Sequence, residues 1–150
     1  MKKWIFALAF LAASTAHADN LSIAFGPSLD GDTHPHMLAV GHEKILGEVS
    51  IFSHCGIMFG SPWNPWCAVV PSVHIETLSG IFTRAGVGVA YFARTDDRVS
   101  SNVNANISWT VGLTQNGWEA FLEADHFSNG GLKPPNPGSD HVCLGVAVSL

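Results

Sequence analysis

Charged residues and long apolar runs are both scarce in this chain. Only 13% of its 150 residues are charged although 47% are apolar, whereas about a quarter of the residues of a soluble domain are usually charged. After the amino-terminal segment, no stretch approaches the roughly 20 consecutive apolar residues that a membrane-spanning helix needs. The apolar residues are therefore distributed over short segments, which excludes a protein built from transmembrane helices.

Basic residues are also few, with 7 lysines and arginines against 12 aspartates and glutamates. A protein that binds nucleic acid neutralises phosphates with a basic surface. We therefore expect no nucleic-acid partner.

Cysteine is rare as well, and the three cysteines form an odd number, which is a poor disulfide framework. Cys55 and Cys67 could meet across a hairpin, but small side chains on a strand face are the interpretation that we favour. No cysteine–histidine spacing typical of zinc is present. We expect neither a metal nor a cofactor.

The amino terminus has the features of a secretory signal. Lys2 and Lys3 precede an apolar run, and Ala16-His17-Ala18 fits a cleavage site with small residues at its first and third positions. We expect residues 1–18 to be a signal peptide and residues 19–150 to form the mature domain.

Alternation of apolar and polar residues with a period of two is the strongest pattern in the mature chain, and it indicates β-strands. In residues 104–114, one face is apolar and consists of Ala105, Ile107, Trp109, Val111 and Leu113. The same alternation recurs between turn signals and predicts about eight strands. They lie near residues 20–27, 35–43, 47–59, 66–78, 81–94, 103–114, 117–128 and 141–150.

The connections between these segments alternate in length. Those after the first, third, fifth and seventh segments are long, and those between are tight, such as the hairpin signal Asn116-Gly117. Long loops at one end and tight turns at the other are typical of an outer-membrane barrel. We therefore predict an all-β fold, an eight-stranded antiparallel up-and-down transmembrane β-barrel.

A soluble barrel, with its apolar face turned inward, is the competing interpretation. Two patterns favour the membrane barrel. Polar residues that suit a narrow interior occupy the face opposite the apolar one, namely His74, Glu76, Arg84, Glu119 and Glu123. Aromatic residues that suit an interface girdle lie toward strand ends, namely Trp63, Trp66, Tyr91 and Trp118.

A possible catalytic group lies at the end of the seventh predicted strand. His126 and Ser128 are two residues apart, so they point to the same side of a strand. Strand parity places both on the apolar, outward face, and it places Asp140 on that face of the next strand. A base, a hydroxyl and an acid that meet on one surface could act as a nucleophilic triad. With an even strand number the odd-numbered loops face the cell surface, so this site would lie level with the outer leaflet and its lipopolysaccharide.

At these residues the chain resembles the lipid A 3-O-deacylase family of PagL-like outer-membrane hydrolases. The resemblance rests on His126-Phe-Ser128-Asn129-Gly130-Gly131, on Pro134-Pro135-Asn136-Pro137-Gly138, and on an acid twelve residues after the serine. At the level of motifs it covers about residues 117–150. The family's usual acid is glutamate, whereas Asp140 is one methylene shorter, so the loop, His141 or a water would have to help it reach the imidazole.

The resemblance implies a bacterial outer-membrane serine esterase that removes the 3-position acyl chain of lipid A and releases a 3-hydroxy fatty acid. Ser128 would be the nucleophile, His126 the general base and then acid, and Asp140 the orienting acid. Asn136 and the Gly131 N–H would supply an oxyanion hole, while Asn129 could instead order the loop. Lipid A, or lipopolysaccharide, would be the substrate, and a homodimer is left open.

Two alternatives remain. A non-enzymatic small barrel in adhesion or envelope integrity would tolerate substitutions in residues 129–139 without any change in lipid. A soluble barrel that binds an apolar ligand inside would extract without detergent.

Overall fold

The computed structural model describes residues 20–29, 36–60, 63–96, 99–132, 134 and 138–150. The predicted signal peptide lies outside these residues and stays a prediction. In the described part of the chain, no helix has the length and apolar character needed to cross a membrane.

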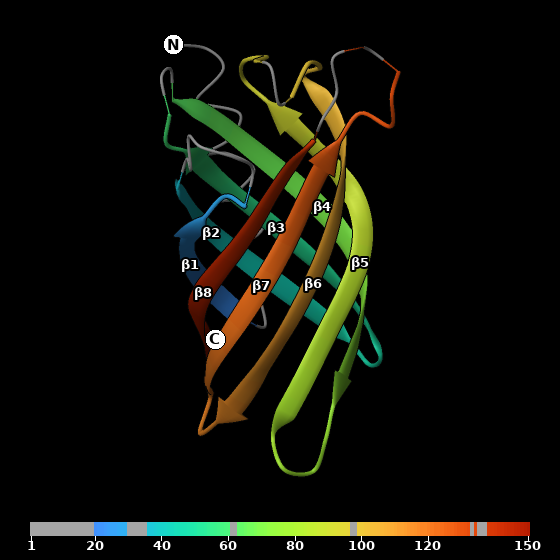
Figure 1. Ribbon diagram of the computed structural model, residues 1–150. Helices are drawn as coiled ribbons and strands as arrows, with labels where there is room; N and C mark the ends of the chain where they lie inside the picture. Colours follow the sequence, from blue (N-terminus) through green and yellow to red (C-terminus); the bar gives the residue numbers. More distant parts are fainter. Residues whose placement is uncertain (1–19, 30–35, 61–62, 97–98, 133, 135–137) are drawn as a thin grey trace.

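The regular structure consists of strands, each paired antiparallel with its neighbours in sequence, and β1 pairs with β8 to close the barrel (Figure 1). The strands are β1 Asn20–Pro27, β2 His36–Leu46, β3 Val49–Met58, β4 Asn64–Glu76, β5 Ile81–Phe92, β6 Val103–Gln115, β7 Trp118–Ser128 and β8 Ser139–Ser149. The predicted eight-stranded up-and-down topology is confirmed.

Tight turns and long connections lie at opposite ends of the barrel, as predicted (Figure 1). At the β6–β7 turn, Asn116 and Gly117 both have positive φ, 54° and 77°, which matches the right-handed twist of the flanking strands. The largest boundary error is at β2, which continues to Leu46 instead of ending at residue 43. The turn there uses Gly47, whose φ of 75° favours glycine, and residues 44–46 pair with β3. The other predicted strand bounds differ from the observed ones by at most two residues.

The outward positions of the strands are apolar and exposed, and the inward positions hold buried polar groups together with buried aromatic and aliphatic side chains. Outward residues that are at least 45% exposed include Ile23, Val87, Ile107, Trp109, Leu122, Leu144 and Val146. An apolar exposed outer face is expected when lipid replaces water as the solvent.

Arg84, which is 4% exposed, lies at the centre of a polar network inside the barrel. Its guanidinium donates to Glu43 at 2.7 Å, to Glu123 at 2.8 Å and to Thr110 at 2.9 Å. Its Cζ also lies 3.7 Å from the centroid of the Phe52 ring. Burying a charge is costly unless it is paired and hydrogen-bonded, and Arg84 meets both conditions. This charged network occupies part of the interior, whereas the soluble-barrel alternative requires an apolar cavity there.

Two residues do not lie where the sequence pattern placed them: Trp66 was expected in the outer aromatic girdle and Glu76 in the interior. Trp66 is only 2% exposed and packs inside, with its ring 4.9 Å from that of Phe127, because it occupies an inward position of β4. Trp63, Tyr91 and Trp118 are exposed, as a girdle requires. Glu76 is exposed at the last position of β4 rather than enclosed in the barrel.

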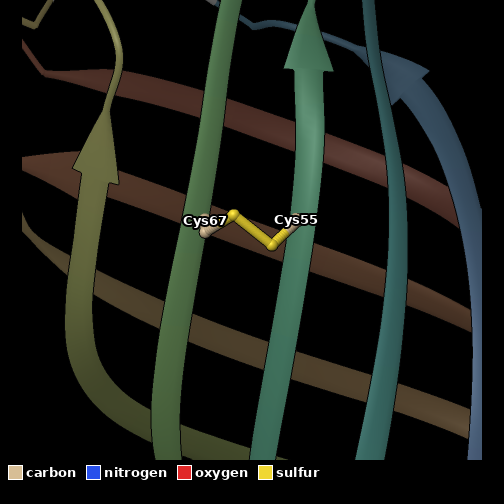
Figure 2. Close-up of a disulfide and its surroundings, with 2 residues drawn as sticks. All are labelled: Cys55 and Cys67. Atoms are coloured by element: carbon tan, nitrogen blue, oxygen red, sulfur yellow. A yellow bond between two sulfur atoms is a disulfide. The ribbon is translucent and has the colours of Figure 1, made fainter. Parts of the chain in front are cut away.

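Cys55 and Cys67 form a disulfide between β3 and β4 (Figure 2). The two residues are direct partners in the strand register, and such partners have Cα atoms close enough for a bridge. Our preference for two small unpaired side chains was therefore wrong.

Candidate active site

The His126 and Asp140 side chains contact each other on the outer wall of the barrel. The two residues are direct partners in the register of β7 and β8. Asp140 Oδ1 lies 2.7 Å from His126 Nδ1, and the side chains are 51% and 37% exposed. Side chains directly opposite each other start only about 4.5–5.5 Å apart at Cβ. The shorter aspartate therefore reaches the imidazole without help from the loop or a water.

His141 does not intervene between them. Its side chain is 1% exposed and points inward, with Nε2 2.9 Å from Ser139 Oγ. The possibility that His141 relays the contact is therefore wrong, and the reason is strand parity, because His141 neighbours Asp140 and faces the opposite side.

The contact with Asp140 determines what the other ring nitrogen of His126 can do. A carboxylate accepts, so the hydrogen bond places a proton on Nδ1 of the imidazole. In the neutral ring Nε2 then carries the lone pair and can accept a proton. This is the tautomer that a general base needs.

Ser128 occupies the last position of β7, on the same face as His126. Its Oγ accepts a hydrogen bond of 3.1 Å from the Gly130 N–H. A backbone donor therefore already points at the oxygen that would attack a substrate, which sequence reasoning missed because glycines in this segment also fit ordinary turn chemistry.

Asn129 anchors the loop that follows β7. It is 5% exposed, its Nδ2 donates to Ser100 Oγ at 2.8 Å, and its Oδ1 accepts from the Gly131 N–H at 3.0 Å. The loop-ordering interpretation of Asn129 thus has direct structural support. Gly131 would have to exchange this hydrogen bond before its N–H could act in an oxyanion hole. Asn136 lies outside the described residues.

Gly138 packs against the His126 imidazole, a role that the sequence pattern did not reveal. Its φ is 82°. A Cβ added there would lie 2.8 Å from His126 Cε1 and 3.1 Å from the Phe127 carbonyl oxygen. Only glycine combines this backbone conformation with so close an approach to the ring.

An outward groove of about 250 Å³ begins at His126 and Asp140. Most of its lining is apolar, and the residues are Leu29, Ile107, Trp109, Ala124, Asp125, His126, Asp140, His141 and Val142. Ile107 and Trp109 are about half exposed on this face, at 50% and 55%. The polar pair therefore adjoins an apolar surface that suits a hydrocarbon chain.

Similarity to known proteins extends across this region. Residues 59–149 match the family Lipid A 3-O-deacylase (PagL). The lipid A deacylase PagL of Pseudomonas aeruginosa is 36% identical over 73 residues, which cover 46% of this chain and 42% of that protein. The match thus spans less than half the length of this curated relative.

Solved structures share the barrel. The crystal structure of the outer membrane enzyme PagL superposes with a TM-score of 0.67 and 23% identity, over 87% of this chain and 99% of that one. The N-terminal β-barrel domain of Pseudomonas aeruginosa OprF gives a TM-score of 0.62 at 15% identity, over 89% and 98% of the two chains. Neisserial surface protein A gives 0.60 at 10% identity, over 87% and 95%. At these identities the superpositions establish the fold, and the family match over more than half of the chain establishes the lineage: this outer-membrane β-barrel belongs to the lipid A 3-O-deacylase (PagL) family.

Proposed function

We propose that this protein is an outer-membrane serine esterase that hydrolyses the acyl ester at the 3-position of lipid A and releases a 3-hydroxy fatty acid. The observation that carries the proposal is the 2.7 Å contact between His126 Nδ1 and Asp140 Oδ1 on the lipid-facing wall. It leaves His126 Nε2 as a base, two residues from a hydroxyl on the same face.

In the first half of the reaction, Ser128 Oγ attacks the ester carbonyl carbon while His126 Nε2 takes the hydroxyl proton. The carbonyl oxygen becomes an oxyanion. When the tetrahedral intermediate collapses, the bond to the sugar oxygen breaks and His126 returns its proton to that oxygen. The products are an acyl-serine and lipid A with a free 3-hydroxyl.

In the second half, His126 removes a proton from water, which attacks the acyl-serine carbonyl. Collapse of the second intermediate releases the fatty acid and restores the Ser128 hydroxyl. Asp140 keeps the imidazole in its productive tautomer and stabilises the imidazolium that forms twice in the cycle.

Backbone donors at the start of the β7–β8 loop would stabilise the oxyanion. Gly131 and Asn136 are the candidates from the sequence motif, and the Gly130 N–H lies beside them. The Gly130 and Gly131 N–H groups bond to Ser128 Oγ and Asn129 Oδ1, so each would exchange that hydrogen bond for one to the oxyanion. One oxyanion-hole donor is typically worth about 10²- to 10³-fold in rate.

The position of the groove supports a lipid substrate. Its apolar lining faces outward next to the His126–Asp140 pair, so an acyl chain packed along the barrel wall could present its ester without leaving the membrane. A water-soluble ester would gain little from such a surface.

The proposal can be tested by expressing the protein in a Gram-negative host whose lipid A keeps all its acyl chains. We expect mass spectrometry to detect lipid A that lacks one 3-hydroxyacyl group, and the free 3-hydroxy fatty acid should appear in stoichiometric amount. Loss of a chain from another position, or no loss in cells that contain the folded barrel, would count against the proposal.

A further inference from the structure

Three buried side chains meet inside the barrel, behind the wall that carries His126. His54 comes from β3, and Glu123 and Asp125 come from β7; they are 1%, 1% and 3% exposed. Their potential ligand atoms all lie within 4.8 Å of one another, and His54 Nδ1 is 3.7 Å from Glu123 Oε1. None of the three has a part in the proposed esterase reaction.

In each of these side chains, the polar atom that points away from the other two ligands is hydrogen-bonded to a neighbouring residue. His54 Nε2 lies 3.1 Å from Asn106 Oδ1, and Asn106 Nδ2 donates to Asp125 Oδ1 at 3.0 Å. Glu123 Oε2 accepts from Arg84 at 2.8 Å. Since the amide oxygen of Asn106 can only accept, His54 carries a proton on Nε2, and a neutral ring has its lone pair at Nδ1.

The polar atoms by which the three side chains face one another have no such hydrogen bond among the described residues. Within the described residues, His54 Nδ1, Glu123 Oε1 and Asp125 Oδ2 are buried and have no hydrogen-bond partner. A protonated imidazole would form an ion pair with Glu123 through the 3.7 Å contact. When the imidazole is neutral and the carboxyls are ionised, all three atoms are acceptors. A single water has two hydrogens and cannot satisfy three acceptors, and leaving buried acceptors unsatisfied is costly.

The charge of the interior favours a cation. The described interior buries four carboxylates, those of Glu43, Glu119, Glu123 and Asp125, against one arginine, Arg84. We propose that His54, Glu123 and Asp125 bind a divalent transition-metal ion inside the barrel, with Zn²⁺ as the probe. One imidazole and two carboxylates form a ligand set of the kind that zinc uses, with one position left for water.

The geometry fits after a small contraction. Atoms that lie within 4.8 Å of one another have a common point no more than about 2.8 Å from each, and zinc bonds to nitrogen and oxygen are about 2.0–2.2 Å long. Movements of roughly half an ångström or slightly more would therefore complete the site. Asn106 fixes the orientation of two ligands at once, as the hydrogen-bonding partners of metal ligands commonly do.

The ion would have a structural role. It would join β3 to β7 across the interior, and it would fix Asp125, which immediately precedes His126 and faces the opposite side. His126 is itself bonded to Asp140 of β8. The carboxyl-terminal end of β7 would therefore be restrained on both its inner and its outer face. The groups of the proposed esterase site lie outside the barrel and do not touch this ion.

The test uses the full mature barrel, folded in detergent, stripped with a chelator and titrated with Zn²⁺ in a calorimeter. Asp125→Asn and His54→Gln remove ligands while nearly keeping size. Glu119→Gln is the matched control, because Glu119 is also a buried β7 carboxyl on the inner face but bonds to Asn20 at 2.8 Å. Heat-modifiable migration on gels reports whether each barrel has folded.

We expect wild type and Glu119→Gln each to bind one equivalent of zinc with the same affinity. Asp125→Asn and His54→Gln should bind it at least 100-fold more weakly. Asn106→Ala should weaken it about 10- to 100-fold. Equal binding by all variants would place the zinc at another site and overturn the proposal, as would the absence of binding to the wild type. Should the ligand variants not fold, X-ray absorption of the wild-type zinc form decides: one imidazole with carboxylate oxygens supports the site, and any other ligand set contradicts it.

Discussion

His126 and Asp140 are direct cross-strand partners on the outer face of the barrel, with Nδ1 and Oδ1 2.7 Å apart. The orienting role that we propose for Asp140 depends on this register, because it brings the carboxylate to the imidazole without a longer side chain. It also places the pair at an edge of an apolar groove rather than in an enclosed pocket.

Asp140→Asn should lower kcat by about 10²- to 10⁴-fold and leave KM nearly unchanged. The amide can donate to Nδ1 and hold the imidazole in the wrong tautomer, as in serine hydrolases generally. Steady-state kinetics on lipid A in mixed micelles would measure kcat and KM separately. Asp140→Glu should retain more activity than Asp140→Asn, and equal rates for the two variants would show that no carboxylate is needed.

Gly138→Ala should reduce activity because the new methyl group would displace the imidazole. The added Cβ would lie 2.8 Å from His126 Cε1, at a φ of 82°. Gly117→Ala is the matched control, since that glycine has a φ of 77° and no atom of the described residues lies within 4 Å of an added Cβ. Turnover would be compared at equal amounts of folded barrel. Similar turnover for the two variants would refute the packing argument.

Asn129→Ala should lower turnover and increase cleavage of the β7–β8 loop by protease. The variant loses the hydrogen bonds to Ser100 Oγ and from the Gly131 N–H. Ser100→Ala removes only the first of these bonds and should have a smaller effect on both readouts. A loop that resists protease equally in wild type and Asn129→Ala would mean that Asn129 does not order it.

Arg84→Met should destabilise the barrel by about 3–5 kcal/mol, because it removes the guanidinium that neutralises the buried carboxylates of Glu43 and Glu123. Urea unfolding in detergent or lipid vesicles, followed by tryptophan fluorescence, would measure the loss. Arg94→Met is the control, since Arg94 is exposed beyond the end of β5, and its unfolding midpoint should match that of the wild type.

Alternation and turn chemistry were sufficient to predict the strands, the closure and the outward face of His126, Ser128 and Asp140. Parity follows from the pleat and needs no knowledge of partners. Register does not follow from parity, so the direct pairing of Cys55 with Cys67 could not be predicted, nor could the direct pairing of His126 with Asp140.

Contacts between side chains across the interior could not be predicted from the sequence either. His54 meets Glu123 and Asp125 only because closure brings β3 opposite β7, and no spacing in the sequence encodes that meeting. Trp66 was misplaced for a related reason: an aromatic ring suits both an interface girdle and an inner layer, and only its strand position distinguishes them.

The central claim is that Ser128 is the nucleophile of a lipid A esterase, and lipid A mass spectrometry on cells that express Ser128→Ala tests it most directly. Ser79→Ala, which changes an exposed hydroxyl in the β4–β5 turn at the other end of the barrel, serves as the control. We predict full deacylation by wild type and Ser79→Ala and none by Ser128→Ala, with all three barrels folded in the outer membrane. Deacylation by folded Ser128→Ala at the wild-type level would contradict the account.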